Sequence, residues 1–292
     1  MIANRPPTLR AVVVTGASSG IGRACALRLD KEGFRVFAGV RREEDAAALG
    51  RAASDRLSTI FLDVTDETSI ASAVETVARA VGEAGLVALV NNAGILVPGP
   101  LEFLSVSDIR RQFEVNVFGQ LAVTRAFLPL LRRGRGRIIN MGSVGGKIAM
   151  PFIAPYNASK FAMEAFTDSL RMELRTWNIP VTIIEPSFIA TPLWSKSRAR
   201  ADDTLKDLPP QANNLYGTLV DRARKGYTNL GKSAVPAEDV ARAIVHVIRV
   251  RRPKARYPVG RGAWLQTALF VHVPDRLKDF LITTWLYKFL GR

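Results

Sequence analysis

Short apolar runs alternate with longer segments of helical periodicity along most of this chain of 292 residues. One run, Leu86-Val87-Ala88-Leu89-Val90, would be apolar on both faces of a strand. Strands of that kind belong to parallel sheets that helices cover on each side, and the alternation implies right-handed crossovers. The sequence therefore predicts an α/β fold, a doubly wound parallel sheet of about seven strands in a single domain spanning 1–292. We expect strands at 11–15, 35–40, 57–62, 86–91, 136–142, 180–186 and 256–259, and helices near 20–33, 66–81, 105–131, 154–178 and 237–250.

Composition and charge limit the classes of function. Hydrophobic residues make up 48% of the chain, enough for a large core. The formal net charge is +15, and arginines cluster at 132–137 and 249–256. Such clusters can attract nucleic acid, anionic lipid or a phosphorylated cofactor. Because no aromatic side chains are interleaved with them, we favour an arginine-rich solvated surface and expect no nucleic-acid partner.

The cysteine, histidine and apolar content bears on compartment and metals. Cys25 is the single cysteine and cannot form an internal disulfide, which fits a reducing cytosol, and we expect it to be buried in a helix. We find no secretory signal and no apolar run of the ~18 residues that a membrane span needs, so a cytoplasmic protein is expected. His246 and His272 lack partners at metal-ligand spacing, so no metal site is expected.

A glycine-rich turn follows the first predicted strand and opens the first predicted helix, with the sequence Thr15-Gly16-Ala17-Ser18-Ser19-Gly20-Ile21-Gly22. Glycines permit tight turning and close approach of the backbone, and the helix N-terminus offers N–H groups and a positive dipole to a pyrophosphate. The context predicts a Rossmann-type dinucleotide site built on Gly16, Ser18, Ser19, Gly20, Ile21 and Gly22.

The end of the second predicted strand bears on the choice between NAD and NADP. A carboxylate there would bind the ribose hydroxyls of NAD. This chain instead has Arg41 and Arg42, whose guanidinium groups suit a 2′-phosphate. We expect NADP(H), with NAD(H) kept as the alternative because one arginine could stack on adenine and the other be merely solvated.

Tyr156 and Lys160 lie four residues apart in a predicted helix, so both side chains project from one face. A free tyrosine has a pKa near ~10 and is a poor acid or base at neutral pH. A fixed cation beside it should lower that pKa by favouring the phenolate. With Ser143 upstream, the pair predicts a site that protonates a carbonyl oxygen during reduction.

These motifs together resemble the short-chain dehydrogenase/reductase family over about residues 10 to 190. The matching pieces occur in the order of the family pattern; they are 15–22, Asp63-Val64, Asn91-Asn92-Ala93-Gly94, Asn116, Ser143, Tyr156 with Lys160, and Pro186 to Thr191. Within the family, the resemblance is to NADP-dependent carbonyl reductases and to hydroxysteroid- and retinol-type dehydrogenases.

The resemblance implies roles for individual residues. Tyr156 would donate the proton, Ser143 would hold the carbonyl oxygen, and Lys160 would lower the phenol pKa and bind the nicotinamide ribose. Asn116 would anchor a water leading from Lys160 towards solvent. The remaining cofactor contacts implied are Asp63 and Val64 at the adenine, Asn92, Ala93 and Gly94 at the adenosine ribose, and Pro186, Ser187, Ile189 and Thr191 at the nicotinamide. Ser187 departs from the usual Pro-Gly of the family, and Asp63 could instead be a simple helix cap.

The substrate is expected to be bulky and apolar, because Ile148, Met150, Phe152 and Trp194 suggest an apolar pocket wall. An NADP-dependent carbonyl reductase or alcohol dehydrogenase, acting as a homo-oligomer, is the favoured function. An NAD-dependent hydroxysteroid-type dehydrogenase and a non-catalytic NADPH-binding regulatory protein are the alternatives.

Two segments fall outside the alternating pattern. Residues 192–235 are polar and weakly periodic, and we expect a substrate-binding loop or lid there, with an inconsequential insertion as the alternative. Residues 263–290 carry large apolar side chains at helical spacing, interrupted by Pro274. We expect two helices packed on the catalytic domain near the substrate loop. The alternative is a peripheral membrane contact, because Trp and Phe with scattered Lys and Arg suit an interface.

Overall fold

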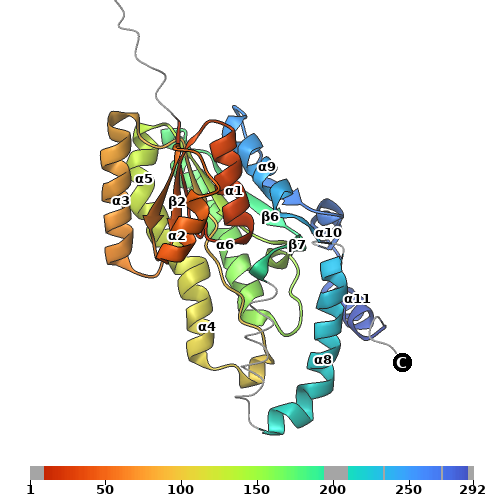
Figure 1. Ribbon diagram of the computed structural model, residues 1–292. Helices are drawn as coiled ribbons and strands as arrows, with labels where there is room; N and C mark the ends of the chain where they lie inside the picture. The colour runs from red at the N-terminus through yellow and green to blue at the C-terminus, as the bar shows by residue number, and fades with distance from the viewer. Residues whose placement is uncertain (1–9, 194–209, 233, 271, 289–292) are drawn as a thin grey trace, which may run out of the picture.

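The computed structural model describes residues 10–193, 210–232, 234–270 and 272–288 (Figure 1). The seven predicted strands form one parallel sheet in the order β3-β2-β1-β4-β5-β6-β9. The predicted doubly wound α/β fold is therefore confirmed. The strands are β1 (Ala11–Val14), β2 (Arg35–Val40), β3 (Leu57–Phe61), β4 (Ala88–Asn91), β5 (Arg137–Met141), β6 (Val181–Pro186) and β9 (Arg256–Val259).

Helices cover both faces of this sheet because alternate strand residues point to opposite sides. Val12 and Val14 of β1 pack with the helices α1 (Gly20–Lys31) and α9 (Ala237–Arg249). Ala11 and Val13 pack on the other face, where α3 (Glu67–Val81) and α5 (Gly119–Arg133) cover the sheet. Cys25 of α1 is buried in the first of these two cores, as predicted.

The helices that follow β4 and β5 carry the candidate site. The segment predicted as one helix over 105–131 consists of α4 (Val106–Phe113), a wide π-helical turn (Glu114–Phe118) and α5. The predicted helix at 154–178 is α6 (Ala154–Glu173), which ends in a short 3-10 turn at Leu174–Trp177. A short helix after β2, α2 (Glu43–Gly50), was not predicted, because its eight residues bury only Leu49 and show little apolar periodicity.

The segment 192–235 contains a long helix, α8 (Pro210–Lys232), where the sequence suggested only a weakly periodic loop. The inward face of α8 carries small apolar residues, of which Ala212, Val220 and Ala223 are buried. Polar residues dominate the rest of the helix, so its apolar periodicity is weak in the sequence. Two short strands flank the segment, β7 (Ile189–Ala190) and β8 (Val235–Pro236). The predicted pocket-wall residue Trp194 lies outside the described residues.

The tail forms two helices on either side of Pro274, as expected, α10 (Ala263–Phe270) and α11 (Asp275–Lys288). α10 packs against the end of β9, and α11 lies beside α8 (Figure 1). The expected packing on the domain is wrong for five large apolar side chains, which are exposed: Trp264, Leu265, Leu277, Phe280 and Leu281. The side chains of the other large apolar residues of the tail lie outside the described part of the structure: Leu269, Phe270, Trp285, Leu286, Phe289 and Leu290. Within the described ranges, no helix combines the length and the apolarity that crossing a bilayer requires.

Candidate active site

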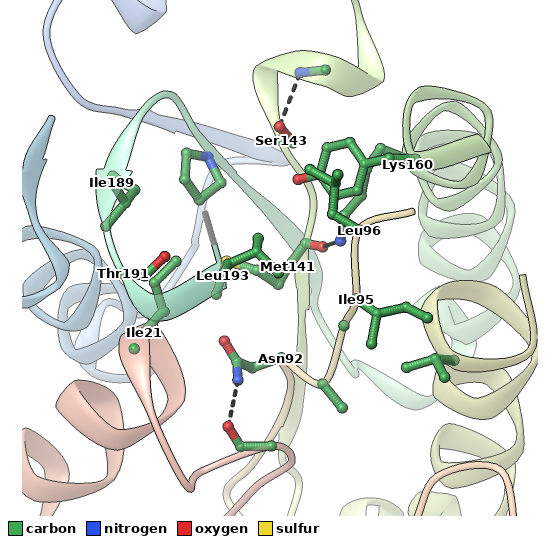
Figure 2. Close-up of a pocket in the computed structure, with 18 of the residues that line it drawn as sticks. Ile21, Asn92, Ile95, Leu96, Met141, Ser143, Lys160, Ile189, Thr191 and Leu193 are labelled. Carbon is green, nitrogen blue, oxygen red and sulfur yellow. Dashed lines mark hydrogen bonds between the residues drawn. The ribbon is translucent and has the colours of Figure 1, made fainter. Parts of the chain in front are cut away.

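A cavity of about 960 Å³ opens at the carboxyl ends of the central strands (Figure 2). Ligands of open α/β sheets bind at this edge, where the strand order reverses, which here is between β1 and β4. Nearly all the residues singled out in the sequence meet in this cavity. Its lining includes Gly16, Ser18, Ser19, Gly20, Ile21, Arg41, Arg42, Asp63, Val64, Asn92, Ala93, Gly94, Ser143, Tyr156, Lys160, Pro186, Ser187, Ile189 and Thr191. Gly22 and Asn116 support the cavity from behind its wall. Phe152, expected in the apolar wall, does not line the cavity and instead packs edge-on against Tyr216 of α8.

The glycine-rich turn forms a cradle between β1 and α1. Gly16 and Gly20 have φ angles of +64° and +57°, which L side chains rarely adopt. A Cβ on Gly22 would lie 2.2 Å from the carbonyl oxygen of Gly16, so only glycine fits there. Asn92 Nδ2 closes the turn by donating to the carbonyls of Thr15 (2.9 Å) and Gly16 (3.1 Å), as Figure 2 shows in part. The cradle and the start of α1 fit the pyrophosphate of a dinucleotide.

Two arginines stand at the end of β2 on the same side of the cavity. Arg41 Nη1 lies 3.5 Å from Asp63 Oδ2, and Arg42 precedes the first residue of α2. Burial raises the pKa of the Asp63 carboxyl, but hydrogen bonds from Thr65 and the nearby Arg41 outweigh it, and the net shift is downward. Asp63 therefore stays ionised and holds Arg41 at the rim. The cap of α3 is Asp66, which accepts from the amides of Thr68 and Ser69.

Tyr156, Ser143 and Lys160 come together from α6 and the end of β5. Ser143 Oγ accepts from the amide of Gly145 at 2.9 Å and hydrogen-bonds to Tyr156. Lys160 is 4% exposed, and its Nζ donates to the carbonyl of Met141 at 2.7 Å (Figure 2). The same Nζ lies 5.7 Å from the centroid of the Tyr156 ring.

The electrostatics of this trio differ from the expectation. Burial raises the pKa of Tyr156, and the hydrogen bond with Ser143 offsets only part of that rise. Burial also lowers the pKa of Lys160 to about 8. The expected lowering of the tyrosine pKa by Lys160 is not found, because desolvation disfavours both charged forms and the ammonium is directed at Met141.

Asn116 lies in the π-helical turn, buried beneath the cavity wall. Its Oδ1 accepts from the amide of Ile95 (2.8 Å), and its Nδ2 donates to the carbonyl of Ile95 (3.0 Å) and to Ser159 Oγ (3.1 Å). Two glutamines continue this row of contacts. Gln112 bonds both Val97 and Ile95, and Gln120 donates to the carbonyl of Ala93. The three amides hold the segment after β4 against the helix.

The opposite wall is the segment that follows β6. Pro186, Ser187, Ile189 and Thr191 all line the cavity, and Thr191 packs directly against Gly20. Ser187 stands where the family pattern has glycine. Its side chain fits because the residue beside it, Gly260 at the end of β9, has no side chain.

Several lining residues were not singled out from the sequence. Tyr227 of α8 donates to the carbonyl of Pro151 (2.8 Å), and Asn157 Nδ2 donates to that of Met150 (2.9 Å). Leu281 and Ile282 reach the cavity from α11. The spacing of Ala212, Val220, Ala223 and Tyr227 was the available signal for α8. The apolar spacing of the tail predicted a helix near the substrate loop, where α11 lies, but no pattern indicates which of its side chains reach the cavity.

At the described positions, no three His, Cys, Asp or Glu side chains gather closely enough to hold a metal ion. His246 instead meets Tyr257 edge-on, with 5.8 Å between the ring centroids.

Comparisons with known proteins agree with this architecture. The family model described as short chain dehydrogenase matches residues 10–202. The chain is similar to human retinol dehydrogenase 5, with 39% identity over 95% of this chain and 89% of the relative. It is also similar to an NADPH-dependent 3-dehydrocapnine reductase of Ornithobacterium rhinotracheale, with 34% identity over 93% and 95%. Among solved structures, a short-chain dehydrogenase from Streptomyces avermitilis covers 97% of this chain, and 98% of its own chain is matched, with a TM-score of 0.76 and 27% identity. The chain therefore belongs to the short-chain dehydrogenase family and is an oxidoreductase.

Proposed function

We propose that the protein is an NADP(H)-dependent oxidoreductase that interconverts the carbonyl and secondary-alcohol forms of a bulky apolar substrate. One observation carries this proposal. Tyr156, Ser143 and Lys160 stand in a single cavity between a glycine cradle that fits a dinucleotide and a wall of apolar side chains. An acid, a carbonyl-binding hydroxyl and a cation are thus available where the two ligands would meet.

The residues of the trio have separate roles in this proposal. NADPH, when bound, supplies the hydride. The raised pKa keeps the Tyr156 phenol protonated at neutral pH, so it can donate its proton to the substrate oxygen. Ser143 Oγ donates a hydrogen bond to the same oxygen and polarises it. Lys160 would bind the nicotinamide ribose and return a proton to Tyr156, and Asn116 would anchor a water that leads from Lys160 towards solvent.

The cofactor preference rests on the end of β2. Arg41 and Arg42 both line the cavity, and guanidinium groups suit a 2′-phosphate. The 3-dehydrocapnine reductase relative is named as NADPH-dependent, which favours the same choice. The Arg41–Asp63 ion pair orients one of the two guanidinium groups in advance. NAD(H) is the alternative cofactor.

The substrate class follows from the distribution of charge in the cavity. Among the described residues that line it, the charged side chains are Arg41, Arg42, Asp45, Asp63 and Lys160. The first four belong to the adenosine end, and Lys160 belongs to the trio. The remaining wall is largely apolar and includes Leu96, Ile148, Met150, Ile153, Phe188 and Leu193. An uncharged apolar ketone or alcohol suits this wall better than a keto acid, because no described cation there would pair with a carboxylate.

Relatives named as retinol and 17-beta-hydroxysteroid dehydrogenases are consistent with a bulky apolar substrate. They also support the second candidate, an NAD-dependent hydroxysteroid-type dehydrogenase. The two candidates differ in the cofactor and in the direction of the reaction, reduction of a carbonyl or oxidation of an alcohol. They share the same catalytic site.

A single experiment tests the proposed function. NADPH oxidation would be followed with a panel of bulky uncharged ketones and with keto acids of similar size. We expect turnover of the ketones, slower turnover of the keto acids, and a lower kcat/KM with NADH than with NADPH. Faster turnover of the keto acids would overturn the substrate class. Absence of NADPH oxidation across the panel would favour a regulatory protein.

We further propose a homo-oligomer located in the cytoplasm. Exposed aromatic side chains on and beside α6, namely Phe118, Phe161 and Phe166, offer a surface for a second copy. Cys25, the single cysteine of the sequence, is buried and unpaired, which suits a reducing compartment. Light scattering of the purified enzyme and fractionation of cells test the two statements.

A further inference from the structure

The two tail helices present large apolar side chains to solvent. Trp264 and Leu265 of α10 are 70% and 51% exposed, and Phe280 of α11 is 62% exposed. Leu277 and Leu281 of α11 are also exposed. Single exposed apolar residues are ordinary, but Leu277, Phe280 and Leu281 share one face of α11 and form an apolar surface that marks a contact with a partner or a membrane.

This apolar surface continues into the cavity. Leu281 is 40% exposed and at the same time lines the cavity, together with its neighbour Ile282. α11 lies beside α8, whose Tyr227 also lines the cavity (Figure 1). The cavity that holds the trio therefore reaches the surface of the molecule where the exposed apolar side chains of α11 lie.

The segments that carry and adjoin this surface have an excess of basic residues. Over residues 210–232 and 261–288 the sequence has eight Lys and Arg but only three Asp and Glu. Arg261 and Arg276 are exposed next to the apolar residues. Aromatic and aliphatic side chains bordered by basic residues suit an anionic lipid interface, where the rings enter the headgroup layer and the cations meet phosphates. An apolar surface of a second copy would not require this excess of positive charge.

We propose that α10 and α11 seat the enzyme on an anionic phospholipid bilayer, with the mouth of the cavity facing the lipid, so that the apolar substrate enters from the membrane. Trp264 and Phe280 anchor the contact, and the basic residues of α8 and α11, with Arg261 just before α10, select anionic headgroups. The substrate-entry part of this proposal rests on the proposed function, whereas the seating itself does not.

Sedimentation with vesicles tests the seating without any substrate. The full-length protein would be mixed with vesicles of phosphatidylcholine alone or of phosphatidylcholine and phosphatidylglycerol in equal parts. We expect binding mainly to the second kind, weakened by salt. Trp264→Ser and Phe280→Ser should each weaken binding about tenfold, as partial loss of the burial of one aromatic side chain implies.

Phe61→Ser is the matched control, because Phe61 is an aromatic residue of similar exposure on β3, at the opposite edge of the sheet from β9. It should leave vesicle binding unchanged. Absence of binding by the wild type, or equal loss in Phe61→Ser and Phe280→Ser, would overturn the proposal. A dimer that Phe280→Ser disperses, observed without vesicle binding, would assign the surface to a second copy and overturn it too.

Turnover separates this proposal from the proposed function. Phe280→Ser does not alter the lining of the cavity, so it should reduce a water-soluble ketone at the wild-type rate without vesicles. It should be several-fold slower than the wild type on an apolar ketone dissolved in anionic vesicles. Equal loss on both substrates would contradict entry from the membrane. A wild type inactive on both, but bound to vesicles, would contradict only the proposed function.

Discussion

The hydroxyl group of Ser187 occupies the space beside the backbone of Gly260, where an added Cβ would lie 2.0 Å from Ser187 Oγ. The two residues follow neighbouring strands, β6 and β9, and Ser187 N donates to the carbonyl of Val259 at 2.8 Å. The serine that departs from the Pro-Gly pattern of the family is therefore accommodated by a glycine more than 70 residues away in sequence.

Gly260→Ala should lower the free energy of unfolding through this clash. Gly260 has a φ angle of +120°, so the alanine is also strained by its backbone. Gly33→Ala is the control for strain alone, because Gly33 has a φ of +84° and nothing within 4 Å of an added Cβ. We expect Gly260→Ala to be about 1–3 kcal/mol more destabilising than Gly33→Ala in urea denaturation. The double variant Gly260→Ala/Ser187→Gly should recover that difference; no recovery would contradict the clash.

Tyr156→Phe should abolish turnover while leaving NADPH affinity nearly intact. The substitution removes the proton donor, and general acids contribute about 10²–10⁴-fold to the rate. Turnover and cofactor fluorescence titration measure the two effects separately. Tyr257→Phe is the matched control, because Tyr257 lies on β9 and accepts from the amide of Lys254 through its hydroxyl. Activity of Tyr156→Phe within about tenfold of the wild type would exclude Tyr156 as the acid.

Arg41→Asp combined with Arg42→Ala should change the cofactor preference. Hydrogen bonds to charged groups contribute roughly 1.5–3 kcal/mol each, so kcat/KM for NADPH should fall at least about tenfold. The value for NADH should change much less, which narrows the gap between the two cofactors. Arg51→Ala, an exposed arginine just after α2, is the control. A wild-type enzyme that already prefers NADH would show that the interpretation of β2 is wrong.

Glu185 should make the stability pH-dependent. It is buried on β6 in a cluster with Glu164, Lys147 and Arg256; Glu164 Oε2 lies 2.7 Å from Lys147 Nζ and 3.0 Å from Arg256 Nε. Burial, and then the hydrogen bond with Glu164, raises the pKa of Glu185 to about 7 from 4.5, against the opposing effect of the two cations. The folded state thus holds a proton that the unfolded state releases at lower pH.

Because that pKa is raised on folding, the contribution of Glu185 to stability is present in full below its unfolded pKa and is lost as pH rises to about 7. Glu185→Gln should remove this loss, so its stability relative to the wild type should grow across that window by about 1–3 kcal/mol. Urea denaturation at a series of pH values measures the difference. Glu75→Gln, at an exposed position of α3, should show no such trend. A constant difference between Glu185→Gln and the wild type would contradict the shared proton.

The strands and the candidate site were predictable because each depends on residues that are close together in the sequence. Strands apolar on both faces, such as Ala11–Val14, leave little choice but a buried parallel sheet. Gly22 cannot be replaced, because a side chain there would clash with the carbonyl oxygen of Gly16 in the same turn. Residues such as Tyr156 and Lys160 could be placed in one site from helical spacing alone.

The electrostatics and the tail could not be predicted in the same way. The pKa of Tyr156 depends on how completely distant segments exclude water from it, which no local pattern reports. Whether Phe280 is buried depends on where α11 packs, and an apolar helical stripe looks the same facing a core or facing outward. Long-range packing, rather than local propensity, decides both.

The π-helical turn gives the helix the same spacing as the extended segment that runs beside it. Gln112, Asn116 and Gln120 are each four residues apart, about 6 Å of helix rise, and they bond positions two residues apart in the segment 93–97, about 6.6 Å of extended chain. In a regular α-helix of 3.6 residues per turn, side chains four residues apart point in slightly different directions around the axis. The wider turn at Glu114–Phe118 compensates for this rotation, so the three amides stay on one face. The spacing of the helix therefore fixes the position of the segment 93–97, which forms this wall of the cavity. Removing one residue from the π-helical turn would shift two of the three side-chain amides away from the backbone groups that they bond.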